Sequence, residues 1–238
     1  SEANSLTIVS GAGTVDFNGA IGTATNGILG TLTVNAGGDT SAGNITFASA
    51  ADVGTATAAG AASLVIGNGS TATLAINGAD YNTSGVQTYT ANAFTLSGAD
   101  PDFNTTNSNV SFVDGATSDI VLTNSANLEI NTGTGGGVID IEPQIKGTGD
   151  DANTNVTLNA GTGNIILDNT GGAVIGTDIG DVTLTGTTIT VSHNIVTDGG
   201  AIDVNGAFVL NSSGNTITVS SDTTHAGNID FDSTINAT

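Results

Sequence analysis

The sequence predicts an all-β fold, a parallel β-helix (β-solenoid) of about a dozen short coils. Three observations predict it. Short apolar-polar-apolar triplets recur along the whole chain, turns rich in small residues separate them, and residues that favour long helices are nearly absent. The alternative fold is a β-sandwich, whose strands are typically longer and bring large aromatic residues into the core. Aromatic residues make up only 4% of this chain, which favours the solenoid.

Composition narrows the fold class further. The chain has 238 residues with 35 Gly, one Lys or Arg in total, and no Met, Cys or Trp. Its Thr, Val, Ile, Asn and Asp residues suit either a pleated strand or its turns. Disorder is the competing interpretation of an acidic, Gly-rich chain. Hydrophobic residues reach 37% and fall in regular triplets, so stacked neighbours have apolar side chains to bury.

Four stretches repeat nearly the same phrase, in which two triplets flank a turn of small residues. The paired triplets are Leu6-Thr7-Ile8 and Val15-Asp16-Phe17, Leu32-Thr33-Val34 and Ile45-Thr46-Phe47, Val156-Thr157-Leu158 and Ile165-Ile166-Leu167, and Ile217-Thr218-Val219 and Ile229-Asp230-Phe231.

Further triplets continue the pattern between these phrases, each alternating inward and outward as a half-buried strand does. In chain order they begin at Leu64, Leu74, Phe94, Val110, Ile120, Leu128, Val138, Val182, Ile189, Ile202 and Phe208. Matching phrases often recur at about 20 residues, a period typical of solenoids. Two short strands per coil would account for this period, and Asn ladders in the turns are expected to stabilise the stack.

Two segments break the regular pattern, and they hold the only prolines. They are 97–109, with Pro101, and 141–147, with Pro143. Because proline cannot donate a hydrogen bond to an internal ladder, we expect both segments to be loops that leave the solenoid body. The whole of 1–238 is expected to form a single β-solenoid domain.

The net charge of −21 limits the partners of this chain. Nucleic acids and anionic lipids are excluded, because both are bound through Lys and Arg. Cations, neutral glycans and further copies of the chain remain. There is no apolar run of about 18 residues that could span a bilayer. With no Cys, thiol chemistry and zinc-thiolate sites are excluded as well.

The two ends of the chain resemble each other. Residues 228–235 closely match residues 14–21, so the chain ends in the middle of its own phrase. A capping element that would cover the edge strands is not visible at either end. The sequence therefore predicts one link of a longer repetitive polymer, joined end to end with other subunits or present as tandem copies in one chain.

The phrases resemble those of giant bacterial surface and secreted proteins of the filamentous-haemagglutinin and autotransporter-adhesin type. The likeness is carried by 5–8 with 13–22, and by 84–89 followed by Phe94-Thr95-Leu96. The resemblance implies a right-handed parallel β-helix that acts in adhesion, biofilm or filament formation. It also implies a secreted or cell-surface location in a prokaryote.

Calcium is the sharpest site hypothesis. Asp150, Asp151, Asn153 and Asn155 offer oxygen ligands at short spacing, which suits a hard cation. The Gly and the late Glu of an EF-hand loop are missing, and a solvated turn is the competing interpretation. No other cofactor is expected.

Catalysis has little support in the sequence, and we expect a protein that is not an enzyme. Carboxylate pairs for hydrolysis could come from Asp100 with Asp102, from Asp150 with Asp151, or from Asp230 with Asp232. Nothing raises one pair above the others. Lys146 is the single basic side chain, and His193 and His225 are the only imidazoles, expected at outward or turn positions.

These observations predict a structural, non-catalytic segment of an extracellular or cell-surface fibre, either a self-assembling filament subunit or a tandem filament module. The first alternative is the shaft of a giant adhesin, with its binding function elsewhere. The second is a glycan-binding or glycan-cleaving β-helix.

Overall fold

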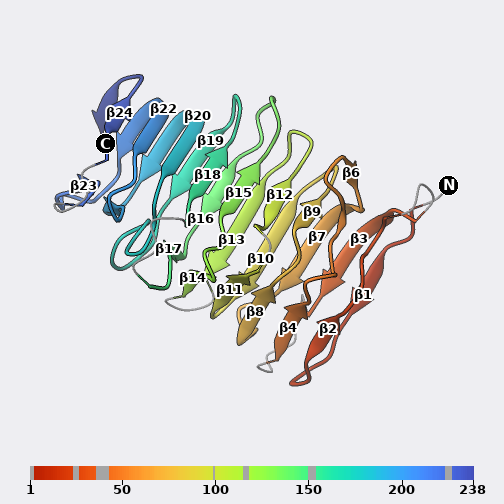
Figure 1. Cartoon of the computed structure of the whole chain (residues 1–238). Coiled ribbons are helices and arrows are strands. Elements are labelled where there is room, and N and C mark those ends of the chain that lie inside the picture. Colours follow the sequence, from red (N-terminus) through yellow and green to blue (C-terminus); the bar gives the residue numbers. More distant parts are fainter. Residues whose placement is uncertain are drawn as a thin grey trace.

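A computed structural model describes residues 3–23, 27–35, 43–98, 100–114, 118–149, 154–222 and 227–238. In these residues the protein contains strands and no helix, and parallel strands stack into a β-solenoid of about eight turns (Figure 1). The predicted fold class is confirmed. The β-sandwich alternative is wrong, because the stacked strands pair in parallel, while sandwiches are built from antiparallel sheets.

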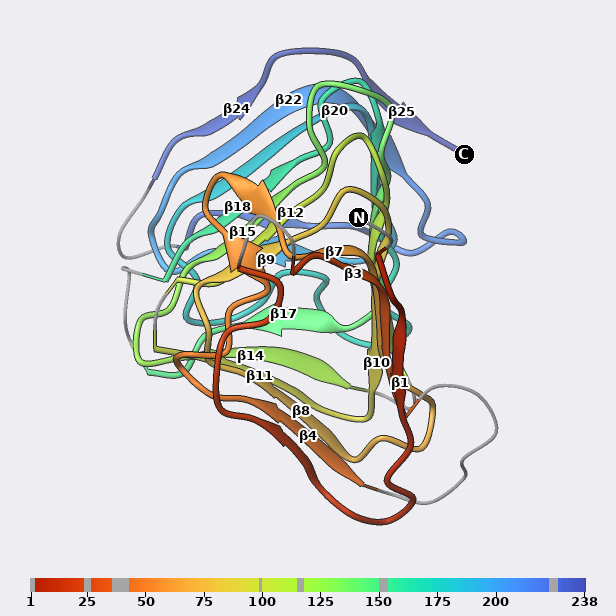
Figure 2. The same ribbon diagram turned by 90° about the vertical axis from the view of Figure 1, so that its right-hand side faces the viewer.

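Each coil turns around three faces, which are visible when the stack is viewed from its N-terminal end (Figure 2). On the first face, in stacking order, lie β1 (Leu6–Ile8), β3 (Leu29–Val34), β7 (Ala61–Gly67), β10 (Gln87–Ala91), β13 (Val110–Asp114), β16 (Ile139–Ile141), β19 (Asn164–Leu167), the second parts of β20 (Val182–Val191) and β22 (Ile202–Leu210), and β25 (Ile235–Ala237).

The second face carries a shorter sheet. Its strands are β2 (Val15–Phe17), β4 (Asn44–Phe47), β8 (Thr73–Ile76), β11 (Phe94–Ser97), β14 (Asp119–Thr123) and β17 (Gln144–Lys146). Ile175 then bridges Ile145 to Ile195, which continues the face into β21 (Ile195–Val196) and β23 (Val219–Ser220).

The third face begins as the single bridging residues Ile21 and Val53. It continues through β9 (Asp80–Asn82), β12 (Asp102–Asn104), β15 (Leu128–Asn131), β18 (Val156–Asn159), the first parts of β20 and β22, and β24 (Ile229–Phe231). One antiparallel hairpin, β5 (Gly54–Thr55) with β6 (Ala58–Ala59), stands apart from this stack.

The number of coils differs from the prediction of about a dozen. Residues in register on neighbouring coils lie from 19 positions apart, as in Ile189 and Phe208, to 32 apart, as in Leu32 and Leu64. The expected period was too short because each coil holds three strand positions and not two. The repeated phrase spans the first and second faces near the N-terminus, but the third and first faces at Val156 and Ile165.

The two proline segments do not leave the solenoid body, so that prediction was wrong. Strand β12 directly follows Pro101 and pairs with both β9 and β15, and β17 directly follows Pro143 and pairs with β14. Each proline lies just before its strand. At the position equivalent to Pro101, the N–H groups of Leu128 and Val156 donate to the carbonyls of Asn155 and Asp181 on the next coil, so Pro101 lacks one ladder hydrogen bond and the strand pairs without it. The carbonyl of Pro101 still accepts a hydrogen bond from the Glu129 N–H at 3.3 Å.

Apolar side chains of the same position stack on one another from coil to coil. The inward row of the third face consists of Ile21, Val53, Tyr81, Phe103, Ile130, Leu158, Leu184, Val204 and Phe231. All of these except the two end residues, Ile21 and Phe231, are fully buried. The interior is therefore a continuous packed column, and each coil depends on its neighbours to bury its apolar face.

Aromatic rings concentrate in the N-terminal half of this column. Phe17 stacks on Phe47 with ring centroids 4.7 Å apart, and Tyr89 stacks on Phe112 at 4.9 Å. Tyr81 and Phe103 join the two groups. Tyr81 contacts Phe47 edge-on at 5.6 Å and stacks on Phe103 at 5.1 Å, and Phe103 contacts Tyr89 edge-on at 5.3 Å. Such pairs add about 0.5–1.5 kcal/mol beyond the area that they bury, so few aromatic residues suffice to order these coils.

Glycines form a column at the corner between the third and first faces. A Cβ on Gly163 would fall on the carbonyl oxygen of Gly137, and a Cβ on Gly206 would fall on the carbonyl oxygen of Gly186. The hypothetical Cβ–oxygen distances are 1.9 and 2.0 Å, whereas real Cβ atoms essentially never lie closer than 3.0 Å to a neighbouring atom. The close approach of successive coils therefore excludes any side chain at this corner.

We expect Gly206→Ala to lower the free energy of unfolding by about 1–3 kcal/mol, because the two coils must separate locally to admit the methyl group. Gly136→Ala is the matched control, since a Cβ there meets nothing within 4 Å. It should change stability by less than about 0.5 kcal/mol. Urea unfolding of both variants measures the difference. Equal stability of the two variants would contradict the close stacking at this corner.

Candidate functional site

A ladder of Asn and Asp side chains runs along the corner between the second and third faces. Each side-chain oxygen accepts a hydrogen bond from the main-chain N–H at the equivalent position of the next coil. The Oδ1 atoms of Asp100, Asn127, Asn155 and Asp181 accept from the N–H groups of Asn127, Asn155, Asp181 and Ala201, at 2.9, 2.8, 2.8 and 2.7 Å. The predicted Asn ladders are thus confirmed, and this one links five successive coils.

The calcium prediction involves one residue of this ladder. Asn155 uses Oδ1 for the Asp181 N–H, and its own N–H donates to Asn127. Asp150, Asp151 and Asn153 lie outside the described residues. The structure therefore gives Asn155 a role in coil stacking, which the sequence analysis missed. The signal was an Asn or Asp directly before an apolar triplet, recurring at spacings of 26 to 28 residues.

Three carboxylates form a second row on the outward side of the third face. Asp80, Asp102 and Glu129 are in register on neighbouring strands, about 4.8 Å apart from coil to coil. Partial burial, with smaller contributions from the charges of Glu129, Asp80 and Asp100, raises the pKa of Asp102 to about 6. Within the described part of the chain, no group of three or more carboxylates and imidazoles is placed to hold a metal ion.

A similar carboxyl lies on the first face. Partial burial raises the pKa of Asp140 to about 6, with smaller contributions from the charges of Asp168 and Glu142. Both Asp102 and Asp140 occupy outward positions of internal strands, where neighbouring coils limit access to water. These carboxyls make the fold sensitive to pH.

Of the carboxylate pairs considered for hydrolysis, Asp150 with Asp151 lies outside the described residues, and only Asp100 and Asp102 have clearly separate roles. Asp100 belongs to the corner ladder, whereas Asp102 belongs to the outward row of β12. Asp230 and Asp232 are both exposed on the last coils. Lys146, the single basic side chain, forms an ion pair with Asp119 of the preceding coil, with Nζ and Oδ2 2.5 Å apart. Lys146 thus serves to link two coils.

The imidazoles are separated from these groups. His193 is half-buried in the turn after β20, and its Nδ1 lies 3.0 Å from the Ser192 hydroxyl. This agrees with the predicted turn position. His225 lies outside the described residues.

Gln87 is a polar side chain at an inward position of the first face, between Leu64 and Val110. It is fully buried, and its Nε2 donates to the carbonyls of Tyr81 and Asn104 at 2.7 and 2.9 Å. Its Oε1 accepts from the Tyr89 hydroxyl at 2.9 Å, and burial raises the pKa of Tyr89 well above its usual value. The polar groups of this network are paired with one another, and the network links the third and first faces at the corner between them.

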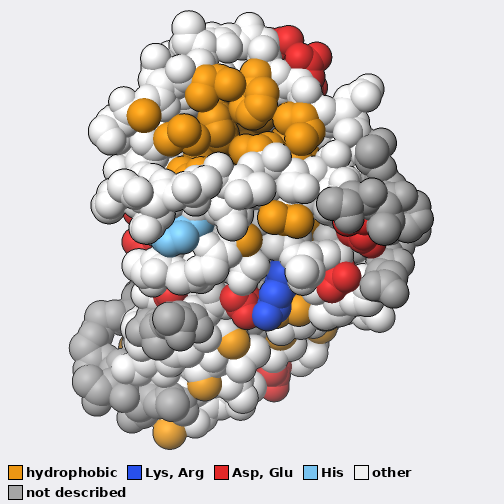
Figure 3. Space-filling view, turned by 90° about the vertical axis from the view of Figure 1, so that its left-hand side faces the viewer, with side chains coloured by type: hydrophobic (Ala, Val, Ile, Leu, Met, Phe, Trp, Pro, Cys, Tyr) orange, Lys and Arg blue, Asp and Glu red, His pale blue; other side chains and the backbone are white. Residues whose placement is uncertain are grey.

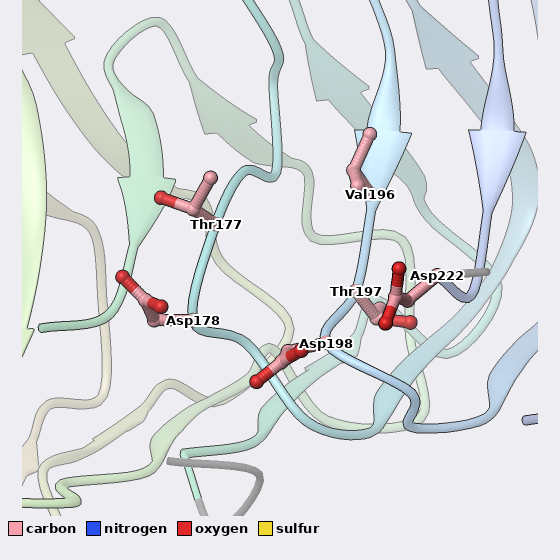
Figure 4. Close-up of a pocket in the computed structure, with 6 residues that line it drawn as sticks. All are labelled: Thr177, Asp178, Val196, Thr197, Asp198 and Asp222. Atoms are coloured by element: carbon pink, nitrogen blue, oxygen red, sulfur yellow. The ribbon is translucent and has the colours of Figure 1, made fainter. Parts of the chain in front are cut away.

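Two shallow pockets open on the surface. One, of about 200 Å³, is lined by Asp178, Asp198 and Asp222 together with Thr177, Val196 and Thr197 (Figure 4). The other, of about 270 Å³, lies beside the β5–β6 hairpin. The described residues that line it are uncharged: Ala56, Thr57, Ala58, Ala59, Asn82, Thr83, Asn104, Thr105 and Thr106.

Both ends of the stack expose large hydrophobic side chains. Large hydrophobic side chains that are exposed include Leu6 and Val9 in the first coil, and Ile229 and Ile235 in the last strands. Figure 3 shows a broad hydrophobic patch on the C-terminal side of the molecule. Within the described residues, β1 and β2 pair only with the second coil, and β24 and β25 pair only with β22. These end surfaces are candidate interaction sites.

Comparison with known proteins finds no matching family model, no similar curated protein and no similar solved structure. The part of the chain that the structure describes contains no helix long and apolar enough to cross a membrane. The functional argument therefore rests on the geometry of this chain.

We expect Asn155→Ala to lower the free energy of unfolding by about 0.5–1.5 kcal/mol, the usual contribution of one hydrogen bond, because the Asp181 N–H loses its acceptor. Asn205→Ala is the matched control: Asn205 lies within β22, in register with Thr185, and its side chain makes no hydrogen bond within the described residues. Thermal and urea unfolding measure both. If Asn205→Ala were as destabilising as Asn155→Ala, the ladder would have no special role.

We expect the protein to become more stable as the pH falls from about 7 toward 4. In the folded state the carboxyl of Asp102 has its pKa raised to about 6, while an unfolded Asp releases its proton near 3.9. Between these values the folded state binds more protons than the unfolded state, so acid favours folding. Asp102→Asn should therefore raise the melting temperature at pH 7.5 and leave it nearly unchanged at pH 4. A variant that loses stability equally at both pH values would contradict this account.

Proposed function

We propose that this chain is a structural, non-catalytic segment of an extracellular or cell-surface fibre. The observation that carries the proposal is the uninterrupted stack, in which apolar rows fill the interior from the first coil to the last. Hydrogen-bond ladders run along the axis on all three faces, and the corner ladder from Asp100 to Ala201 reinforces them. Such a stack resists bending and stretching, which is what a fibre segment requires.

The surface supports the same proposal. Its net charge of −21 keeps neighbouring rods apart in solution, and bound cations would let rods associate side by side. Asp100 and Asp102 serve different positions, and Lys146 is held by Asp119, so these residues form no assembled acid and base for polysaccharide cleavage. This favours a mechanical role over catalysis.

A glycan-binding role is the second candidate, and the pocket beside the β5–β6 hairpin favours it. Its described lining offers hydroxyl, amide and methyl groups and no carboxylate, in a chain that is otherwise strongly acidic. These groups suit a neutral sugar. Glycan-array binding by the purified chain, abolished by Thr57→Val with Asn104→Val, would support this role.

We expect the chain to be found on filaments at the cell surface. Immunogold electron microscopy of intact source cells, with an antibody against this chain, tests the location and the role together. Label spaced regularly along fibres would support a filament segment, and label along single threads that end in a separate head would support the shaft of an adhesin. Label confined to the cell interior would contradict the proposal.

A further inference from the structure

Among the described residues, the strand edges that lack a pairing partner at the two ends of the stack lie on the same three faces. At the N-terminal end the edges are β1 on the first face, β2 on the second and Ile21 on the third. At the C-terminal end they are β25, β23 and β24, in the same order of faces. Each edge exposes main-chain groups that a parallel strand could pair with.

When two copies are stacked end to end, the inward apolar row of each face in one copy continues into the row of the same face in the other. The row of the first face begins at Leu6 and ends at Ile235. The second-face row runs from Val15 to Val219, and the third-face row from Ile21 to Phe231. Placing the first coil of one copy on the last coil of another would therefore set apolar residues on apolar residues in all three rows.

The sizes of the end coils also agree. Leu6 and Leu32 are 26 residues apart, and Phe208 and Ile235 are 27 apart, whereas coils between them vary from 19 to 32 residues. The turns at the corners of the two end coils differ in length. The two coils therefore match in their strand positions on the three faces and not in their corners.

Charge selects one rotational setting of such a joint. In the face-matched setting Asp16 lies opposite Ser220, and Asp230 lies opposite Ala20. If the second copy were rotated by one face, β2 would stack on β24 and place Asp16 on Asp230. Like charges directly opposite each other on neighbouring strands are destabilising. The likeness between residues 14–21, which contain β2, and residues 228–235, which contain β24, would suggest this rotated setting, because it stacks the two similar segments on each other.

We propose that copies of this chain join head to tail, with the first coil of one copy stacked face for face on the last coil of the next. This rests on the proposed function as a fibre segment and names its partner and register. The joint repeats the coil-on-coil contact found throughout the chain. Because two different ends meet, the contact does not close on itself and produces linear polymers.

Engineered disulfides test the register, since the chain contains no Cys. Thr7 and Asn236 are both exposed and occupy the outward row of the first face, so the joint would pair them at about 4.8 Å between Cα atoms. Under mild oxidation, Thr7→Cys/Asn236→Cys should form covalent chains that are multiples of 23.0 kDa. Thr7→Cys/Ser220→Cys should form no covalent chains and run as a 23.0 kDa species under denaturing, non-reducing conditions. Cross-linking of the second variant and not of the first would overturn the face-matched register.

Blocking variants test the polarity of the joint. Leu6→Asp and Ile235→Asp each place a charge in one end surface, at side chains that are 43% and 56% exposed and so tolerate change in the monomer. In sedimentation experiments each variant alone should be monomeric, and a mixture of the two should stop at dimers. Dimers of Leu6→Asp alone would indicate two C-terminal ends in contact and would overturn head-to-tail joining.

The outcome for the fibre role is separate. If the unmodified chain stayed monomeric at all concentrations and neither cysteine variant cross-linked, joining between copies would be wrong. Surface filaments labelled by the antibody would in that case still support the fibre role, with further coils of one polypeptide covering the ends. Polymers in solution without any labelled surface filament would support joining between copies and contradict the role in a surface fibre.

Discussion

Parallel pairing of each coil with the next is the constraint on which the rest of this structure depends. It places every residue directly above its equivalent, so each position becomes a row and each row must be internally compatible. Apolar rows fill the interior, and glycine occupies the corner where Gly186 and Gly206 approach most closely. Asn and Asp occupy the corner where a side-chain oxygen can reach the next main-chain N–H. Like carboxylates in one row, such as Asp80 and Asp102, carry the electrostatic penalty of the same geometry.

The same constraint shapes the function. A column whose interior is packed throughout leaves little room for a buried catalytic cavity, and the described pockets are shallow surface features. The stacking surfaces are used by both neighbours everywhere except at the two ends. There the apolar rows and the free strand edges are exposed together, which makes the ends the natural points of contact for further coils.

Much of the fold could be predicted from the sequence, because a triplet such as Leu32-Thr33-Val34 directly encodes one inward-outward-inward strand. The number of faces could not be predicted, because the same kind of triplet occurs on all three faces. The repeated phrase therefore does not indicate on which face a strand lies. Strand β9 has a single apolar residue, Tyr81, flanked by polar ones, so it lacks the triplet signal. The prolines misled for a different reason: Pro101 lacks the hydrogen bond that the equivalent Leu128 N–H makes to Asn155, yet the remaining contacts keep β12 in the stack. Of the proposed calcium ligands, Asn155 has a role that depends on residues 26 and 28 positions away, which local spacing does not reveal.

Amide hydrogen exchange of the dilute chain, resolved by residue, tests the central claim most directly. If stability comes from coil-on-coil stacking, protection should be highest in middle strands such as β13 and β16, which have a partner on both sides. It should fall toward β1 and β25, which have a partner on one side only. Protection that is uniform along the chain, or highest in the end coils, would contradict the account.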